Sequence, residues 1–309
     1  MKDTVAARYM RQNEVFADAF NFLLYHGRQV IAPDNLTELD TREIEVPYGG
    51  KDGAKQPIQR TRDVMKSVTA MTDWQRAYMI LAAENQSSVN LAMPVKNLVY
   101  DALQYTRQVE LAVESHKRSG DYKGADDEEF LSGFMRSDRL LPVVTLVILF
   151  NSQEWDGPVT LHEMFDCQDQ NVLAFVPDYK INLIVPSALN EEELGRFHST
   201  LREVLSFIKY SDSAEKLEAM ANSEMGNHTL GRKEIDVLNY CIGVDFKMEG
   251  NGERVTMCKA AQQLEERGRL KMLVANVKSL MRTMGWTAEH AMDALDISDS
   301  DRQTVSSQL

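Results

Sequence analysis

The stretch RAYMILAAENQSSVNLAMPVKN, residues 76 to 97, decides how this chain is predicted to fold. Its first half is an apolar run that predicts a strand entering the core, and the run ends on a carboxylate and an amide, Glu84 and Gln86. Pro94 suits the first turn of a helix, where its missing N–H would be unpaired anyway. Because a charged group among apolar atoms is costly, Glu84 is expected to be neutralised, paired or bound to a cation.

The segments on either side of this stretch predict an order of helix, three strands, helix and strand, followed by a short helix and another strand. Apolar residues at helical spacing predict the first helix, which ends just before Gly27. The run LPVVTLVILF, ending at Phe150, is rich in β-branched residues and is typical of a strand buried on both faces. The predicted elements are helix 12–26, a strand around Ile44 and Val46, strands 63–68 and 76–84, helix 94–116, strand 141–150, short helix 161–165 and strand 178–186.

The C-terminal third is predicted to be helical. Strand signals vanish after Leu189, and helical segments follow that are separated by Ser, Asn and Gly breaks. We therefore predict two regions, an α/β domain over residues 1–210 and a helical region over 211–309. The long amphipathic segment from Lys259 to Met284 is expected to serve in packing or in self-association, so a homo-oligomer could form through the C-terminal helices.

Length and composition fit a soluble globular protein. A chain of 309 residues suggests two domains or one large domain with an appendage, and 43% apolar with 26% charged residues is an ordinary balance. No apolar run reaches the roughly 18 to 20 residues that a membrane span needs, and the N-terminus lacks the apolar run of a signal peptide. We therefore expect a cytoplasmic protein with no membrane partner. The three scattered cysteines are expected to be reduced bystanders.

The formal net charge of −13 argues at first sight against a nucleic-acid partner, because phosphate binding depends on clustered Lys and Arg. The distribution of charge is less one-sided. Between residues 51 and 76 three acidic residues face six basic ones, Lys51, Lys55, Arg60, Arg62, Lys66 and Arg76. This segment predicts a local basic surface on an acidic chain, although ordinary solvated side chains would explain it equally well.

Asp63, Glu84 and Gln86 are the candidate site. Asp63 begins one predicted strand, whereas Glu84 and Gln86 share a face at the end of the next. The short connection between these strands makes them neighbours, so the two carboxylates can converge. Oxygen ligands of this kind suit Mg²⁺, which activates water for phosphodiester cleavage. The alternative is structural, with Asp63 as a cap and Glu84 in a salt bridge.

Other catalytic motifs are missing from the sequence. It contains no GxxxxGK[ST], GxGxxG, HExxH or GxSxG pattern, so nucleotide-binding, zinc-protease and serine-hydrolase functions have no motif in their favour. The six histidines stand apart from one another and offer no metal-ligand spacing.

Three segments together carry a resemblance to a known family. They are RDVMKSV, ILAAENQSSVNLAMPVKNLVYDALQY, and FLSGFMRSDRLLPVVTLVILFNSQEWDGPVTLHEMF followed by FVPDYKINLIVP. They resemble the Rpn family of recombination-promoting nucleases and transposases, which belongs to the PD-(D/E)XK superfamily. The resemblance covers roughly residues 1 to 210 and implies a restriction-endonuclease-like α-β-β-β-α-β core. It also implies that Asp63 and Glu84 bind the metal and that Gln86 stands where the superfamily usually has lysine.

The missing lysine is the main departure from the superfamily pattern. Two residues could replace it. Lys66 lies three residues after Asp63 and so faces away from it on a regular strand, whereas Lys96 lies in the first turn of the next helix and is the better candidate. A further carboxylate, Glu14 or Asp18, could complete the metal site, but a solvated helix face is the expected role of each.

The sequence therefore predicts a DNA endonuclease that depends on Mg²⁺ or Mn²⁺ and has a role in recombination or mobile elements. Asp63 and Glu84 would hold the cation, Gln86 would orient water, and Lys55, Arg60 and Arg62 would grip DNA. The alternative is a catalytically inactive DNA-binding or oligomerising module on the same fold. The net charge and the missing lysine favour this alternative.

Overall fold

The computed structural model describes residues 3–40, 42–45, 58–61, 63–72, 75–120, 126–248 and 254–309. The chain divides into two compact units, Met1–Lys209 and Tyr210–Leu309. In the described parts of the chain, none of the helices combines the length and the apolar character that crossing a bilayer would require.

A five-stranded mixed sheet forms the centre of the first unit. The strand order is β1-β4-β5-β6-β7, in which β1, β4 and β5 are antiparallel while β5, β6 and β7 are parallel. The predicted α/β class is thereby confirmed. The strands are β1 (Leu36–Glu38), β4 (Val64–Thr72), β5 (Gln75–Gln86), β6 (Val143–Leu149) and β7 (Asn182–Ile184).

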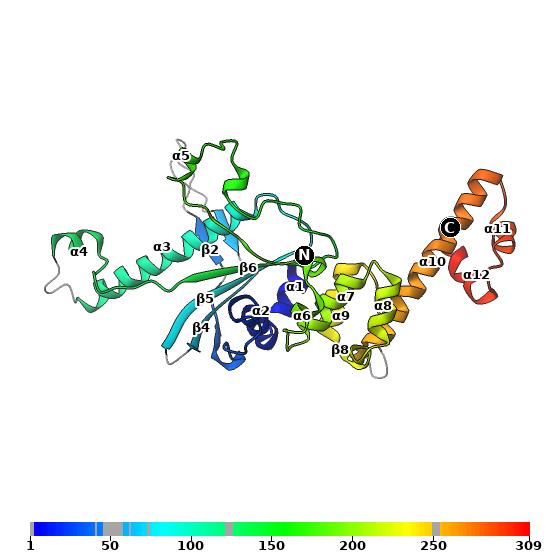
Figure 1. The fold of residues 1–309 in the computed structure, drawn as a ribbon, viewed down its shortest axis with the longest axis horizontal. Helices are drawn as coiled ribbons and strands as arrows, with labels where there is room; N and C mark the ends of the chain where they lie inside the picture. The colour runs from blue at the N-terminus through cyan, green and yellow to red at the C-terminus, as the bar shows by residue number, and fades with distance from the viewer. Residues whose placement is uncertain are drawn as a thin grey trace. The chain divides into compact units, whose positions relative to one another are not determined.

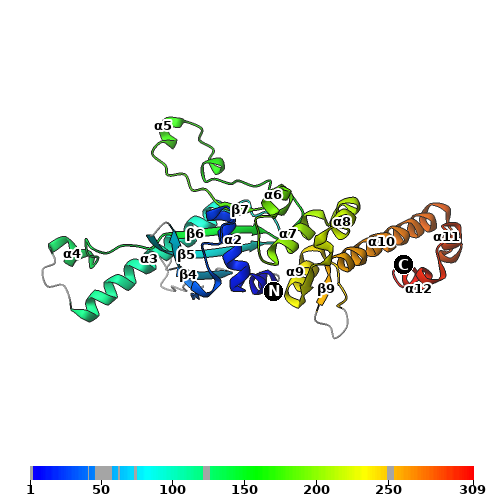
Figure 2. The same cartoon turned by 60° about the horizontal axis from the view of Figure 1, so that its bottom comes forward.

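Helices cover both faces of this sheet. Helix α3 lies on one face, whereas α1 and α2 lie on the other (Figures 1 and 2). Hydrogen bonds of individual side chains agree with this arrangement, because Lys66 of β4 reaches the segment between α1 and α2, and Thr145 of β6 reaches α3. The helices of the first unit are α1 (Asp3–Met10), α2 (Asn13–Tyr25), α3 (Met93–Ser119), α4 (Asp127–Ser132), α5 (Gln170–Leu173), α6 (Glu191–Leu194) and α7 (Leu201–Tyr210).

The strand predicted around Ile44 is confirmed as β2 (Arg42–Glu45). Among the described residues it pairs with β3 (Ile58–Thr61) in a two-stranded ribbon separate from the central sheet. The sheet uses β1 instead, where Leu36 lies opposite Val68. Three residues of β1 are too few for a periodic pattern, so no local signal marks this strand.

Helix α2 is tied to a segment nearly two hundred residues later in the chain. The Asp18 carboxylate accepts hydrogen bonds from the backbone N–H groups of His198 and Ser199, at 2.9 and 2.7 Å, and from the Ser199 hydroxyl at 2.7 Å. Just after the helix, Gly27 has a φ of +88°, and a Cβ there would lie 2.8 Å from the backbone oxygen of Arg196. The prediction that Asp18 is solvated is therefore wrong, since it is buried and joins two parts of the unit.

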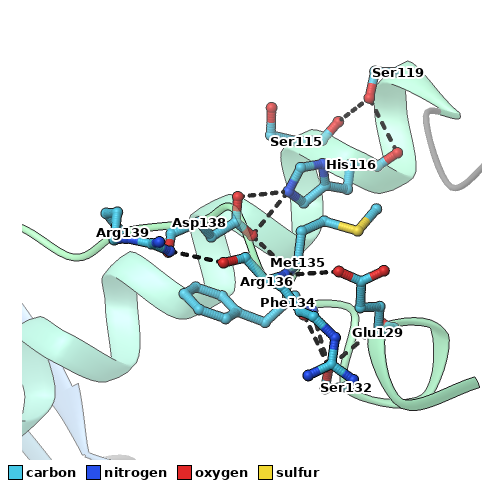
Figure 3. Close-up of polar contacts among 10 residues, drawn as sticks. All are labelled: Ser115, His116, Ser119, Glu129, Ser132, Phe134, Met135, Arg136, Asp138 and Arg139. Atoms are coloured by element: carbon cyan, nitrogen blue, oxygen red, sulfur yellow. Dashed lines mark hydrogen bonds and ion pairs between the residues drawn. The ribbon is translucent and has the colours of Figure 1, made fainter. Parts of the chain in front are cut away.

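The C-terminal end of α3 is bound to the segment that contains α4. His116 Nε2 lies 3.0 Å from Asp138 Oδ2, and the Met135 N–H donates to the same oxygen at 2.8 Å (Figure 3). The Arg136 N–H donates to Glu129 Oε1 at 2.8 Å. These bonds fold residues 126–139 back onto α3, so α4 is held in place although it has only six residues.

The second unit is mostly helical and is organised around one long helix, α10 (Met257–Met284). Its C-terminal half packs against α11 (Ala288–Ala294) and α12 (Asp299–Ser306) through a core that includes Val277, Ala291 and Val305 (Figure 1). Helices α8 (Ala214–Ala221) and α9 (Arg232–Ile242) complete the unit. Strands were not expected here, but β8 (Thr229–Gly231) pairs with β9 (Arg254–Thr256).

Candidate functional site

Asp63 and Glu84 lie side by side on neighbouring strands. Val64, the first residue of β4, pairs with Ala83 of β5, so the preceding residue, Asp63, falls beside Glu84. Asp63 Oδ2 accepts a hydrogen bond of 2.7 Å from the backbone N–H of Asn85. This bond fixes the Asp63 carboxylate against the end of β5, on the face that α3 covers.

Glu84 is buried and forms an ion pair with the first turn of α3. The Lys96 ammonium donates to Glu84 Oε2 at 2.7 Å, with the Glu84 side chain 1% exposed and the Lys96 side chain 27% exposed. Burial alone would lower the pKa of Lys96, but the nearby carboxylates of Glu84 and Asp63 outweigh it and raise this pKa above its usual value. Lys96 therefore carries its charge beside both candidate carboxylates.

Gln86 lies two residues beyond Glu84 and thus on the same face of β5. It is half-buried, and its backbone oxygen accepts a hydrogen bond of 2.8 Å from Phe150, which extends the parallel pairing of β5 with β6. An amide at this position can hold a water or a phosphate oxygen but cannot act as a base near neutral pH.

A buried asparagine near this site was not predicted. Asn97 follows Lys96 on α3 and is fully buried, yet its side-chain oxygen and nitrogen have no hydrogen-bond partner among the residues that the structure describes. A buried amide without a partner is uncommon in folded proteins. The signal was present in the sequence, because the inward stripe of α3 is unusually polar. Its buried residues are Met93, Pro94, Asn97, Tyr100, Asp101 and Gln104.

The next turn of α3 holds the helix firmly on the sheet. The Asp101 carboxylate accepts hydrogen bonds of 2.6 Å from the hydroxyl groups of Thr145, on β6, and Tyr179, just before β7. Charge-assisted bonds of this length are among the stronger ones in proteins. They fix the position of α3, and therefore of Lys96, relative to the strands that carry Asp63 and Glu84.

Lys66 lies on the opposite face of the sheet from the candidate site. Its ammonium donates to the backbone oxygen of Arg11 at 2.7 Å and to the side chain of Asn13, and it lies 5.1 Å from the centre of the Phe16 ring. Burial lowers the pKa of this lysine, although Glu38 and Glu14 oppose the effect. Lys66 is therefore a structural residue, as its three-residue offset from Asp63 predicted.

The two additional carboxylates considered from the sequence also lie away from the site. Asp18 is used in the bonds with His198 and Ser199, and Glu14 is exposed on the side of the sheet that Lys66 faces. Of the predicted DNA-binding residues, Lys55 and Arg62 lie outside the described residues. Arg60 belongs to β3, for which the structure describes the backbone alone.

The residues present suit a divalent cation held in part by the protein. Across the described ranges, no group of three or more His, Cys, Asp or Glu side chains is arranged to hold a metal. Mg²⁺, however, is often bound by one or two carboxylates and completes its shell with waters and substrate phosphate. Asp63 and Glu84 supply two carboxylates, and the buried amide of Asn97 lies one residue from Lys96.

Comparison with known proteins gives no further guide to this site. The chain matches no protein-family model, no curated protein and no solved structure. The resemblance to recombination-promoting nucleases therefore stays a prediction based on the sequence segments themselves.

Proposed function

We propose that the first unit is a metal-dependent nuclease that hydrolyses phosphodiester bonds in DNA, on a restriction-endonuclease-like core. The observation that carries the proposal is the placement of Asp63, Glu84 and Lys96 at one end of β5, where two carboxylates meet an ammonium on the same face. The order of elements, with antiparallel β1, β4 and β5, helix α3 and parallel β6, is consistent with such a core. A role in recombination or mobile elements would follow from the resemblance alone.

The proposed roles follow from the chemistry of each side chain. Asp63 and Glu84 would hold the cation, and the bound Mg²⁺ would lower the pKa of a water and neutralise charge on the scissile phosphate. Lys96 would take the place of the superfamily lysine, because its ammonium can stabilise the negative charge that develops on the phosphate. Gln86 would orient the water through its amide.

The direct test is cleavage of plasmid DNA in Mg²⁺ or Mn²⁺ by wild type, Asp63→Asn and Glu84→Gln. We expect each substitution to lower the cleavage rate by at least about a hundredfold, the usual cost of removing a group that stabilises the transition state. Asp34→Asn, a change at an exposed carboxylate of the same unit, is the matched control and should cleave like wild type. Equal rates in all four proteins would overturn the proposal.

The rival function is a DNA-binding or oligomerising module without catalysis. The ion pair between Lys96 and Glu84 favours it, since the pair already compensates the buried charge without any metal. Calorimetric titration of the protein with Mn²⁺ separates the two functions. Binding that disappears in Glu84→Gln supports the nuclease, whereas wild type that binds no Mn²⁺ would leave Glu84 with a structural role.

A further inference from the structure

Helix α10 is basic although the whole chain is acidic. Its 28 residues contain six basic and two acidic side chains, while the chain as a whole has a formal charge of −13. The basic residues are Lys259, Arg267, Arg269, Lys271, Lys278 and Arg282. Such a concentration of positive charge on one element of an acidic protein indicates an anionic partner.

Some of these side chains line a groove within the second unit. The groove has a volume of about 750 Å³ and lies between one face of α10, residues 244–247 and Gln308. Three cations of α10 line it, Lys259, Arg267 and Lys271. They are eight and four residues apart, so they lie on one face of the helix. Lys247 contributes from the segment after α9.

Hydrogen bonds fix the two walls of the groove relative to each other. The Lys247 N–H donates to Gln263 Oε1 at 2.6 Å, and Gln263 Nε2 donates back to the Lys247 carbonyl oxygen at 3.1 Å. The Arg267 guanidinium donates to the Gly243 carbonyl oxygen. The two walls of the groove are therefore fixed relative to each other, and the Arg267 side chain is tied to both.

The acidic side chains of the groove oppose this charge only in part. Glu266 lies 2.5 Å from Arg269, which also pairs with Asp301 at 2.9 Å. The pairing with Arg269 lowers the pKa of Glu266, so Glu266 is compensated inside the protein. Asp245 is the other carboxylate among the described lining residues, against four cationic side chains.

We propose that this groove binds the phosphate groups of a nucleic-acid strand. Lys259 and Lys271 are twelve positions apart, about 18 Å along a helix, whereas charges along one strand of B-form DNA follow each other about every 3.4 Å. The cations could therefore contact several phosphates. The lining residues that the structure describes include no aromatic ring on which a base could stack, so binding is independent of base sequence. The inference needs no metal and does not depend on the nuclease activity of the first unit.

The test compares two double variants of the full chain with equal loss of charge. Lys259→Gln/Lys271→Gln alters the groove, while Lys216→Gln/Arg232→Gln alters exposed cations that lie outside α10 and do not line the groove. The probe is a labelled single-stranded DNA of about 20 nucleotides in EDTA, so that cleavage cannot occur, and binding is measured by anisotropy over a series of NaCl concentrations.

For the groove variant we expect weaker binding. The slope of log K against log NaCl concentration should be less steep by about 1.4, which is about 0.7 for each of the two phosphates that the variant no longer neutralises. The control variant should keep the wild-type salt dependence. Equal slopes in the two variants would overturn the inference, and so would wild type that binds no DNA at low salt. Because the readout is binding in EDTA, its result is separate from that of the cleavage test.

Discussion

At the scale of single residues, the ion pair between Lys96 and Glu84 matters for stability as well as for chemistry. Replacing Lys96 by Met would leave a carboxylate that is only 1% exposed without its cation. We expect Lys96→Met to lower the free energy of unfolding at pH 8 by about 3 kcal/mol, because removing one partner of a buried pair leaves an uncompensated charge. Lys117→Met, at an exposed position on the same helix, is the control and should change it by less than about 1 kcal/mol.

The difference in unfolding free energy between wild type and Lys96→Met should depend on pH, because the pKa of Lys96 is shifted in the folded protein. The pKa of Lys96 is raised above 10.5 in the folded protein, so the stabilisation is fully present below that pH and is lost as the pH rises through the folded value. Denaturant unfolding should therefore show wild type and Lys96→Met converging above about pH 10.5. Lys66 titrates in both proteins, so its contribution cancels. A constant difference up to about pH 12 would contradict the prediction.

Cys167 and Cys241 are expected to differ in reactivity because their surroundings differ. Burial raises the pKa of the Cys241 thiol to about 12, whereas Cys167 is exposed. Because the thiolate is the reactive form, we expect iodoacetamide at about pH 7.5 to label Cys167 in the native protein and to spare Cys241. Peptide mass spectrometry gives the site of labelling, and labelling in denaturant serves as the control, in which both should react. Rapid native labelling of Cys241 would show this prediction to be wrong.

The sequence predicted the position of the candidate carboxylates better than their surroundings. Alternation along two neighbouring strands was enough to place Asp63 and Glu84 on one face, and helix position was enough to favour Lys96 over Lys66. The burial of Asp18 could not be predicted, because its partners lie about 180 residues away. Asn97 was missed although the inward stripe of α3 is polar, because polarity alone does not show that an amide lacks a partner among the described residues.

At the scale of elements, the turn after α2 lies very close to the segment that contains Arg196. Both Gly27 and Gly120 have a positive φ, +88° and +64°, but of these two only Gly27 would bring a Cβ into contact with a described residue, Arg196. Gly120→Ala should therefore lower the free energy of unfolding by about 1 kcal/mol, the cost of the backbone conformation alone. Gly27→Ala should cost at least about 2 kcal/mol, because the clash adds to it. If urea unfolding gave both variants the same loss of unfolding free energy, the close approach of Gly27 to Arg196 would be contradicted.

Elements with a long periodic pattern were predicted well, whereas several short ones were not. The apolar stripes of α2 and α3 and the β-branched run of β6 identify these elements directly. Strands β1, β8 and β9 have three residues each, and pairing with distant segments holds them in place. Tertiary pairing, which a local window cannot detect, therefore decides where the chain uses short strands.

At the scale of the whole molecule, the two compact units each bury a core of their own. Leu81 is fully buried in the first unit, and Val277 is fully buried in the cluster between α10, α11 and α12. We expect Leu81→Ala and Val277→Ala to lower the melting temperatures of two different calorimetric transitions, each through the cavity that it creates. If both substitutions lowered a single common transition, the units would unfold as one body.

Helix α10 organises the packing of the second unit. Its buried side chains pack within its own unit, against α11 and α12 among others, but apolar and polar residues are not separated into two faces along its length, so the predicted amphipathic pattern is wrong. Self-association through this helix stays a prediction that sedimentation can check. The groove could not be predicted from the sequence of α10. Its other wall consists of residues after α9, and folding alone brings these residues next to α10.

The bond between Asp18 and the backbone at residues 198 and 199 also sets the order in which the first unit can be completed during synthesis. The partners are separated by 180 residues or more, and a ribosome adds roughly 5 to 20 residues each second. Helix α2 therefore emerges roughly ten to forty seconds before the chain that covers it. Throughout that interval Phe22 of α2 lacks Phe197, the ring on which it stacks in the finished protein at a centroid distance of 4.3 Å.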